Sequence, residues 1–167
     1  GKLTVSVPQS VGHVPVFYNH KPSGRGYYHR PGTPEKPGRD YVFASTDPLF
    51  PFGFGLSYTS FEYSDLKFRK KNLTDRDTME LSLKVRNTGA VSGKEVVQVY
   101  INDLISSVTT PVKVLKGFKK VSIKPGEITT LSFSIPCSEL GLWNKDMNYI
   151  IEPGEFEIMI GASAEDI

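Results

Sequence analysis

The chain has 167 residues, of which 38% are hydrophobic and 23% charged, and its formal net charge at pH 7 is +2. This length allows one domain with a substantial core, or one domain together with part of another. A net charge so close to zero gives no reason to expect nucleic acid or an anionic membrane as a partner, and no apolar run approaches the length of a membrane span. The single cysteine excludes an internal disulfide and a multi-cysteine metal site.

Residues 1–18 predict two short extended segments. Leu3, Val5 and Val7 alternate with polar residues, and a second apolar run at 14–18 follows a turn. Two isolated strands do not form a stable sheet in water. We therefore expect these segments to complete a sheet whose other strands lie elsewhere.

Residues 19–48 differ from this pattern, because frequent proline and glycine exclude regular secondary structure. Tyrosines, arginines and histidines are scattered among them, whereas disordered linkers are typically poor in aromatic residues. Two interpretations stay open for this loop. Its flat rings and forked guanidinium donors suit sugar rings and hydroxyls, or the same residues fix the loop onto a neighbouring domain.

Residues 49–58, which we call the aromatic linker, are dense in phenylalanine and glycine. Pro51 and the glycines exclude a helix, and the aromatic content is too high for a solvated spacer. We predict a buried seam in which the rings lock one module onto its neighbour and the glycines allow close backbone approach. The predicted seam residues are Phe50, Phe52, Gly53, Phe54, Gly55 and Tyr58.

From residue 61 onward, apolar residues recur with a period of two, and turn signals follow about every ten residues. This pattern predicts an all-β fold, an immunoglobulin-like or fibronectin type III-like sandwich of about seven strands. The lack of a cysteine pair favours the fibronectin-like branch. We expect Cys137 to be a buried thiol, residues 137–141 to form a short helix, and Trp143 to cap one end of the core. The predicted strands are 61–68, 79–86, 96–101, two short strands within 112–123, 128–135, 149–151 and 156–160.

The sequence shows no pattern that predicts catalysis. The three histidines have no partnering cysteine and do not fit a zinc site, and the glycines of the aromatic linker do not complete a nucleotide-binding fingerprint. The carboxylates lie in turns, where such groups are mostly solvated or cap backbone donors. We predict no catalytic residue, no metal and no cofactor.

Two sequence blocks resemble the C-terminal portion of glycoside hydrolase family 3, which includes β-glucosidases and β-xylosidases. The first is Pro-Phe-Gly-Phe-Gly-Leu-Ser-Tyr at 51–58, and the second joins Asn-Thr-Gly at 87–89 to Gly-Lys-Glu-Val-Val-Gln-Val-Tyr at 93–100. The order and spacing of the blocks agree with the family, and the resemblance covers essentially the whole chain. Shorter matches lie at 3–12, 15–19, 61–63, 115–118 and 125–127.

The resemblance implies a larger enzyme in which a (β/α)8 barrel and an α/β sandwich domain precede a fibronectin type III-like domain. Residues 1–18 would then be the terminal strands of the incomplete α/β sandwich domain, 19–60 an irregular loop with the aromatic seam, and 61–167 the fibronectin type III-like sandwich. The nucleophile and the acid/base residue of the retaining mechanism belong to the missing barrel and sandwich domains, so no catalytic residue is carried over. The implied partners are those missing domains and, through them, a carbohydrate substrate, and the implied location is periplasmic or secreted.

In relatives, the loop that corresponds to 19–47 lies toward the active-site side. The resemblance therefore implies that Arg25, Arg39, Asp40 and Tyr41 line the outer, leaving-group subsites.

Two functional hypotheses follow. In the first, the chain is a non-catalytic C-terminal part of a retaining, exo-acting β-glycosidase that braces the catalytic domains and lends the loop to the outer subsites. In the alternative, it is an independent carbohydrate-binding or adhesive fibronectin-like module. The predicted sandwich strands carry no strip of aromatic residues on which a sugar chain would bind, which favours the first hypothesis.

Overall fold

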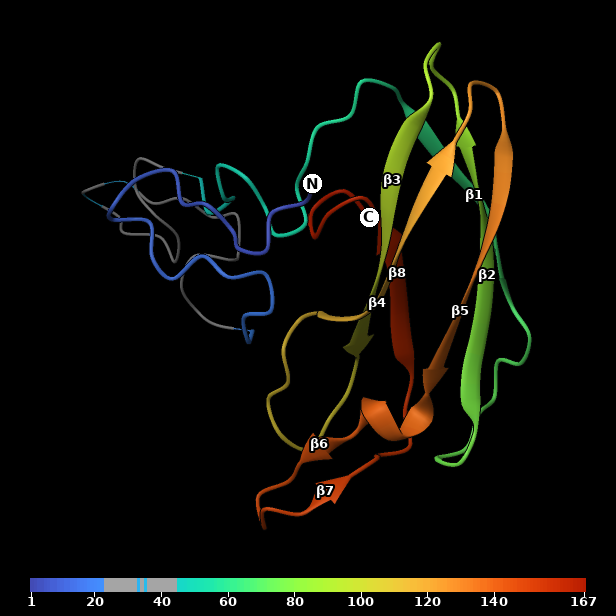
Figure 1. Ribbon diagram of the computed structural model, residues 1–167. Coiled ribbons are helices and arrows are strands. Elements are labelled where there is room, and N and C mark those ends of the chain that lie inside the picture. Colours follow the sequence, from blue (N-terminus) through green and yellow to red (C-terminus); the bar gives the residue numbers. More distant parts are fainter. Residues whose placement is uncertain (23–32, 34, 36–44) are drawn as a thin grey trace.

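The computed structural model describes residues 1–22, 33, 35 and 45–167. Within these residues, the regular structure consists of antiparallel strands and one short 3-10 helix (Figure 1). The strands are β1 (Phe61–Phe68), β2 (Thr78–Asn87), β3 (Gly93–Asp103), β4 (Val114–Ile123), β5 (Ile128–Pro136), β6 (Leu142–Trp143), β7 (Tyr149–Ile150) and β8 (Phe156–Gly161), with the helix η1 (Cys137–Leu140) between β5 and β6.

Two three-stranded sheets form the body of the molecule. One has the order β1-β2-β5 and the other β4-β3-β8, and every pairing in them is antiparallel. The strands β6 and β7 form a separate hairpin at one end of the body (Figure 1). The predicted all-β sandwich is therefore confirmed.

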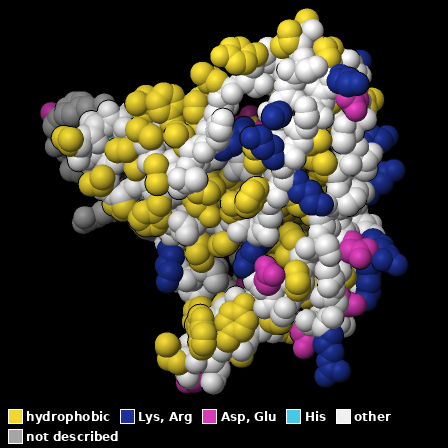
Figure 2. Space-filling model, viewed as in Figure 1, with side chains coloured by type: hydrophobic (Ala, Val, Ile, Leu, Met, Phe, Trp, Pro, Cys, Tyr) yellow, Lys and Arg dark blue, Asp and Glu magenta, His cyan; other side chains and the backbone are white. Residues whose placement is uncertain are grey.

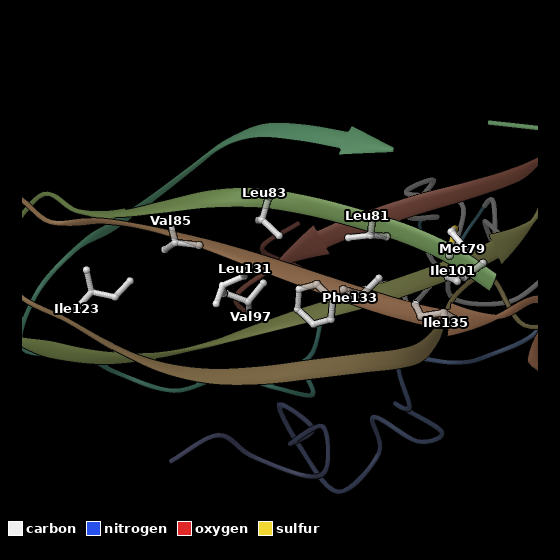
Figure 3. Packing of buried hydrophobic residues seen from close by; sticks show 11 residues of the cluster. Met79, Leu81, Leu83, Val85, Val97, Ile101, Ile123, Leu131, Phe133 and Ile135 are labelled. Carbon is white, nitrogen blue, oxygen red and sulfur yellow. The ribbon is translucent and has the colours of Figure 1, made fainter. Parts of the chain in front are cut away.

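The core lies between the two sheets and follows from the period-two pattern. In β2, alternate residues are buried, and β5 repeats the alternation beside it in direct register, with Leu83 opposite Leu131. Val97 of β3 approaches from the other sheet (Figure 3), and Val99 belongs to the same cluster. The buried cluster consists of Met79, Leu81, Leu83, Val85, Val97, Val99, Ile101, Ile123, Leu131, Phe133 and Ile135.

The two short strands predicted within 112–123 are wrong, because β4 is one continuous strand. It pairs with β3 on both sides of an irregularity, where Val99 lies opposite Gly117 but Tyr100 lies opposite Leu115. Lys116 is the extra residue of this bulge. A bulge lets a strand bend without losing its partner, and this explains why the glycine does not end the strand.

The prediction for Trp143 is also wrong, whereas those for Cys137 and the short helix are confirmed. Trp143 is 60% exposed, because it lies on the β6–β7 hairpin outside the space between the sheets. Cys137 is a buried free thiol at the start of η1, and burial raises its pKa.

Residues 1–22, which we call the N-terminal segment, contain no regular strand. The first of the two extended segments predicted there forms an isolated bridge with the linker, between Val7 and Phe50, and the second, at 14–18, forms no strand. This agrees with the physical expectation that two short segments need further partner strands to build a sheet.

Candidate functional site

The aromatic linker runs beside the start of the N-terminal segment. The N–H of Val7 donates to the carbonyl of Phe50, and the N–H of Leu3 donates to the carbonyl of Phe54, both at 2.8 Å. The Leu3 carbonyl in turn accepts from the N–H of Gly53 at 2.8 Å. These bonds tie the two segments together into one layer at the side of the sandwich (Figure 1).

Phe52 joins a ring contact through which Tyr18 attaches this layer to the sandwich. It stacks on Tyr18 with ring centroids 4.2 Å apart, and Tyr18 meets the fully buried Tyr100 of β3 edge to face at 5.7 Å. The backbone N–H of Leu115 in β4 also donates to the Tyr18 hydroxyl at 3.3 Å. Three rings from three segments thus form one continuous contact, an arrangement that aromatic side chains favour.

Gly53 allows the linker backbone to approach β3 closely. Its φ is +78°, and a Cβ there would lie 2.1 Å from Oε1 of Gln98. The Gln98 side chain is buried and donates from Nε2 to the carbonyls of Gly53 at 3.2 Å and Ala162 at 2.6 Å, while its Oε1 accepts from the Tyr100 hydroxyl at 2.6 Å. This one amide therefore links the linker, β3 and the segment that follows β8.

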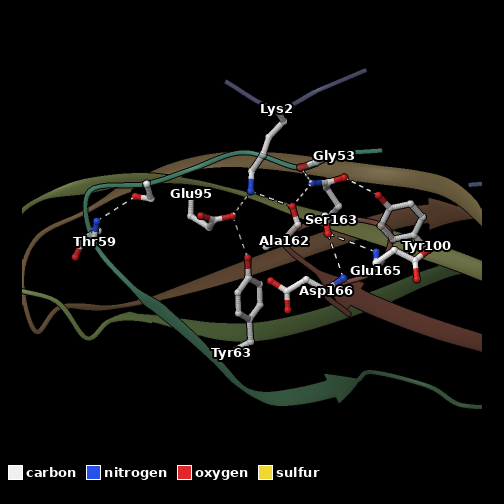
Figure 4. A network of polar contacts seen from close by, with 12 residues as sticks. Lys2, Gly53, Thr59, Tyr63, Glu95, Tyr100, Ala162, Ser163, Glu165 and Asp166 are labelled. Carbon is white, nitrogen blue, oxygen red and sulfur yellow. Dashed lines mark hydrogen bonds and ion pairs between the residues drawn. The ribbon is translucent and has the colours of Figure 1, made fainter. Parts of the chain in front are cut away.

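A second polar network joins the first residues of the chain to the sandwich (Figure 4). Lys2 Nζ lies 3.1 Å from Oε1 of the buried Glu95 and donates to the Ala162 carbonyl at 2.9 Å. The Tyr63 hydroxyl donates to the same Glu95 oxygen at 3.2 Å. Burial raises the pKa of the Tyr63 hydroxyl well above its usual value, and the Glu95 carboxylate adds to the shift. A buried carboxylate needs such partners, because an uncompensated buried charge is strongly destabilising.

The end of the linker is fixed by Asn87, the first residue of the Asn-Thr-Gly block. Its side-chain oxygen accepts from the Thr59 hydroxyl at 2.6 Å and from the Gly89 N–H at 3.0 Å. Its Nδ2 donates to the Ile123 carbonyl at 3.0 Å. The fully buried Asn87 therefore joins the start of β1 to the turn after β2 and the end of β4.

The remaining predicted seam residues lie in different surroundings. Phe50 and Phe54 pack on each other with ring centroids 5.0 Å apart, and the Phe50 ring is partly exposed. A Cβ at Gly55 would lie 2.4 Å from the Gly1 carbonyl oxygen, so this glycine also permits a close backbone approach. Tyr58 is fully exposed.

Large apolar side chains of the N-terminal segment and the aromatic linker face solvent. Figure 2 shows hydrophobic side chains covering much of the left part of the molecule, where these two segments lie. We call this surface the apolar face. Its residues are Leu3, Val5, Val11, Val14, Phe17, Leu49, Phe50, Leu56 and Tyr58.

The predicted substrate-binding residues Arg25, Arg39, Asp40 and Tyr41 lie outside the described residues. The described part of the chain holds no group of three or more His, Cys, Asp or Glu residues that could bind a metal ion. No helix among the described residues is long and apolar enough to cross a membrane.

The sequence patterns did not predict the side chains of the sandwich that hold the linker and the first residues of the chain. Glu95 and Gln98 are buried polar residues of β3, where Glu95 pairs with Lys2 and Gln98 donates to the Gly53 carbonyl of the linker. Their presence within the largely apolar run 95–100 could have predicted them, because polar residues that are buried require hydrogen-bond partners.

The fibronectin type III-like domain family matches residues 95–164. Over 98% of its length, the chain is 43% identical to a periplasmic beta-glucosidase of Salmonella typhimurium, and over 99% it is 44% identical to a beta-xylosidase of Formosa agariphila. The chain spans 21% and 22% of these two relatives, about a fifth of their length.

Two solved structures show the same fold over nearly the whole chain. A β-glucosidase from Erythrobacter marinus matches 98% of this chain with a TM-score of 0.85 and 39% identity. A beta-glucosidase from Listeria innocua, in complex with glucose, matches 99% with a TM-score of 0.83 and 35% identity. This chain covers 20% and 23% of those two proteins.

Proposed function

Because the chain belongs to the C-terminal part of glycoside hydrolase family 3 enzymes, with their fibronectin type III-like domain, we propose that it is a non-catalytic, bracing part of such an enzyme. The enzyme would be a retaining, exo-acting β-glycosidase of the β-glucosidase type. Its barrel and α/β sandwich domains would supply the nucleophile and the acid/base residue. Residues 1–18 would complete the sandwich domain, 19–60 would form the loop and the seam, and 61–167 the fibronectin type III-like domain.

The observation that carries this proposal is the contrast between the backbone and the side chains of the aromatic linker. Its backbone is tied to the sandwich through Gly53 and to the N-terminal segment through Leu3, whereas the apolar face remains in contact with water. Monomeric proteins rarely expose large contiguous apolar patches. The remaining domains of the enzyme are the natural occupant of this face, since the matched relatives are about five times longer than the chain.

The test is a matched pair of substitutions in the full-length enzyme that contains this chain. Leu49 on the apolar face is 55% exposed and Ile128 at the start of β5 is 56% exposed, so both side chains have similar access to solvent. Leu49→Asp should destabilise the full-length enzyme by about 1.5–3 kcal/mol, because it places a charge where an apolar side chain becomes buried. Ile128→Asp should change the free energy of unfolding by less than about 0.5 kcal/mol.

In the 167-residue chain alone, both substitutions should leave the unfolding temperature unchanged. Equal effects of the two substitutions in the full-length enzyme would contradict the proposal. The 167-residue chain should also show no hydrolysis of an aryl β-glucoside, and measurable turnover would contradict its non-catalytic role.

The loop at 19–47 gives the proposal a second part, which rests on the sequence resemblance. Arg25, Arg39, Asp40 and Tyr41 would contact the leaving-group side of the substrate. In the full-length enzyme, Arg39→Ala should then raise KM about tenfold with kcat unchanged, because a binding interaction common to ground and transition state is lost. Arg69→Ala is the control, since Arg69 is exposed and pairs with Glu80 on the sandwich surface. An unchanged KM for the Arg39 variant would exclude this role.

The alternative hypothesis of an independent carbohydrate-binding or adhesive module receives little support from the two large sheets. Among the described residues of β1–β5 and β8, Phe118 is the single exposed aromatic side chain. One isolated ring offers little of the stacking surface that a polysaccharide chain would need.

A further inference from the structure

Residues 162–166, which we call the strap, follow β8 and turn back on themselves (Figure 4). The N–H of Ala162 donates to the Asp166 carbonyl at 2.8 Å, and the Ser163 hydroxyl oxygen accepts from the N–H of Asp166 at 3.1 Å. Ser163 and Ala164 are buried although they lie outside the strands and the helix. The backbone groups of a buried turn need partners, so the contacts of the strap indicate its role.

Two stretches of the chain carry the loop at 19–47, and both are fixed to the sandwich. We call residues 18–20 the entry stem and residues 52–53 the exit stem. The Val112 N–H, just before β4, donates to the His20 carbonyl of the entry stem at 2.9 Å, in addition to the ring contact described above. The exit stem is held by the buried amide side chain of β3.

Ala164 of the strap connects the two stems. Its N–H donates to the Phe52 carbonyl of the exit stem at 2.9 Å, and its carbonyl accepts from Nζ of Lys113. Lys113 adjoins Val112, which binds the entry stem, and its Nζ lies 3.5 Å from Oε1 of Glu165. Ala164 is fully buried and the Lys113 side chain is 14% exposed, so these bonds lie in a region of low dielectric, where hydrogen bonds are stronger than in water.

The strap also binds the start of the chain and β3. The Ala162 carbonyl accepts from Lys2 Nζ at 2.9 Å and from Gln98 Nε2 at 2.6 Å. A Cβ at Gly161 would lie 1.8 Å from the Asp166 carbonyl oxygen, so the strap packs directly on the end of β8. Figure 1 shows the strap in red, beside the start of the chain. A turn that only capped β8 would need the bonds within the turn and none of those to the other segments.

We propose that the strap is a positioning device, which fixes the two stems relative to each other and thereby presents the loop at 19–47 to the outer subsites. Lys113 and Ala164 are its positioning residues. The first half of this statement concerns contacts within the chain. The second half rests on the proposed role of the loop.

The test compares two nearby lysines that each donate from Nζ to a backbone carbonyl. Lys113→Met removes the bond to the Ala164 carbonyl and the ion pair with Glu165. Lys116→Met removes a bond to the Glu139 carbonyl in η1 and leaves the contacts of the strap in place. The two variants therefore lose the same charge and the same kind of bond, and only the first loses a contact with the strap.

Hydrogen exchange in the 167-residue chain follows the strap through the Ala164 amide, the exit stem through Gly53 and the entry stem through Val112, because each of these amides donates a hydrogen bond. In Lys113→Met all three should exchange at least about tenfold faster, since a hydrogen bond from a charged donor is lost. In Lys116→Met their rates should stay unchanged. Unchanged rates in Lys113→Met, equal acceleration in both variants, or acceleration of the Ala164 amide alone would overturn the proposal.

Kinetics of the full-length enzyme separate positioning from a loss of stability. Lys113→Met should raise KM for an aryl β-glucoside at least about threefold with kcat unchanged, because only binding to the loop is weakened. Lys113→Arg keeps a cationic donor and should restore KM, and Lys116→Met should leave it unchanged.

The comparison with Arg39→Ala distinguishes a failure of the strap from a failure of the loop. If Arg39→Ala raises KM and Lys113→Met does not, the strap does not position the loop and the proposal is overturned. If Arg39→Ala leaves KM unchanged, the role of the loop in the proposed function fails, and the second half of this proposal fails with it. The exchange rates then still decide whether the strap fixes the stems.

Discussion

In the sandwich, apolar residues of β2, β3 and β5 are buried against the opposite sheet, whereas in the aromatic linker Leu49 and Leu56 face solvent although the backbone around them is firmly attached. Both regions are rich in apolar residues, but those of the sandwich are buried and several of those in the linker are exposed. Each of the two sheets supplies one side of the core, so both sides of that contact belong to this chain. The linker and the N-terminal segment instead leave large apolar side chains exposed, and that difference supports the proposal that the apolar face packs against the other domains of a larger enzyme.

The sandwich core and the linker also differ in the polar side chains that hold them in place. The cluster between the two sheets is apolar, while Gln98 bonds to the linker backbone and Glu95 pairs with Lys2 of the N-terminal segment. Hydrophobic packing holds a region together over a wide range of geometries, whereas a buried hydrogen-bonded network requires one arrangement. The linker is thus held in a defined position against β3 by the Gln98 amide as well as by the ring contact of Phe52, Tyr18 and Tyr100.

The largest expected effect comes from opening the core. Phe133 is 5% exposed and packs between the sheets, so Phe133→Ala should lower the free energy of unfolding by about 3–5 kcal/mol. Urea denaturation of the 167-residue chain measures this. Phe118→Ala, at an exposed site in β4, should change it by less than about 0.5 kcal/mol. Similar losses for both would mean that the two sheets do not share a well-packed core.

A smaller effect is expected where the linker touches β3. Gly53→Ala should cost about 2–3 kcal/mol, because the residue has positive φ and its Cβ would collide with Gln98. Gly126 separates the two causes, since its φ is +73° but nothing lies within 4 Å of a Cβ there. Gly126→Ala should therefore cost only about 1–2 kcal/mol.

Hydrogen exchange of the Leu3 and Gly53 amides should accelerate in the Gly53 variant and remain slow in the Gly126 variant. Equal exchange rates in both variants would show that contact with Gln98 does not hold the linker.

The smallest expected effect is a change of stability at alkaline pH. The folded-state pKa of Tyr63 is raised above its ordinary value of 10.0, so the stabilisation is complete below pH 10 and is lost as the pH rises further. Near pH 11, about 1 kcal/mol should be lost through this group. Tyr63→Phe should reduce the alkaline loss, as urea denaturation across this pH range would show. Some loss should persist, because burial also raises the pKa of Tyr100. An identical pH dependence in the variant would exclude Tyr63 as a source.

Much of the sandwich could be predicted from the sequence, because a strand with one buried face carries its own signal. The alternation at Met79–Val85 and again at Leu131–Ile135 predicts both the strand and the face that is buried. The β4 bulge and the exposure of Trp143 could not be predicted in this way. Both depend on which strand lies alongside, and a period-two pattern carries no information on that.

The candidate site was predictable only in part. Phe52 and Gly53 stood out as seam residues and they do contact Tyr18 and Gln98, but the sequence pattern did not distinguish them from Tyr58, which is exposed. The domain boundaries at 18 and 60 and the seam itself remain proposals that the Leu49→Asp test addresses.

By itself, the sequence determined the class of fold, the position of the core residues and the family, because these follow from local periodicity and from two specific blocks of residues. Only the tertiary structure decided which side chains hold the linker and which apolar residues remain exposed. Those facts depend on residues far apart in the chain meeting in space, and a pairing of this kind has no signature in the sequence around either partner.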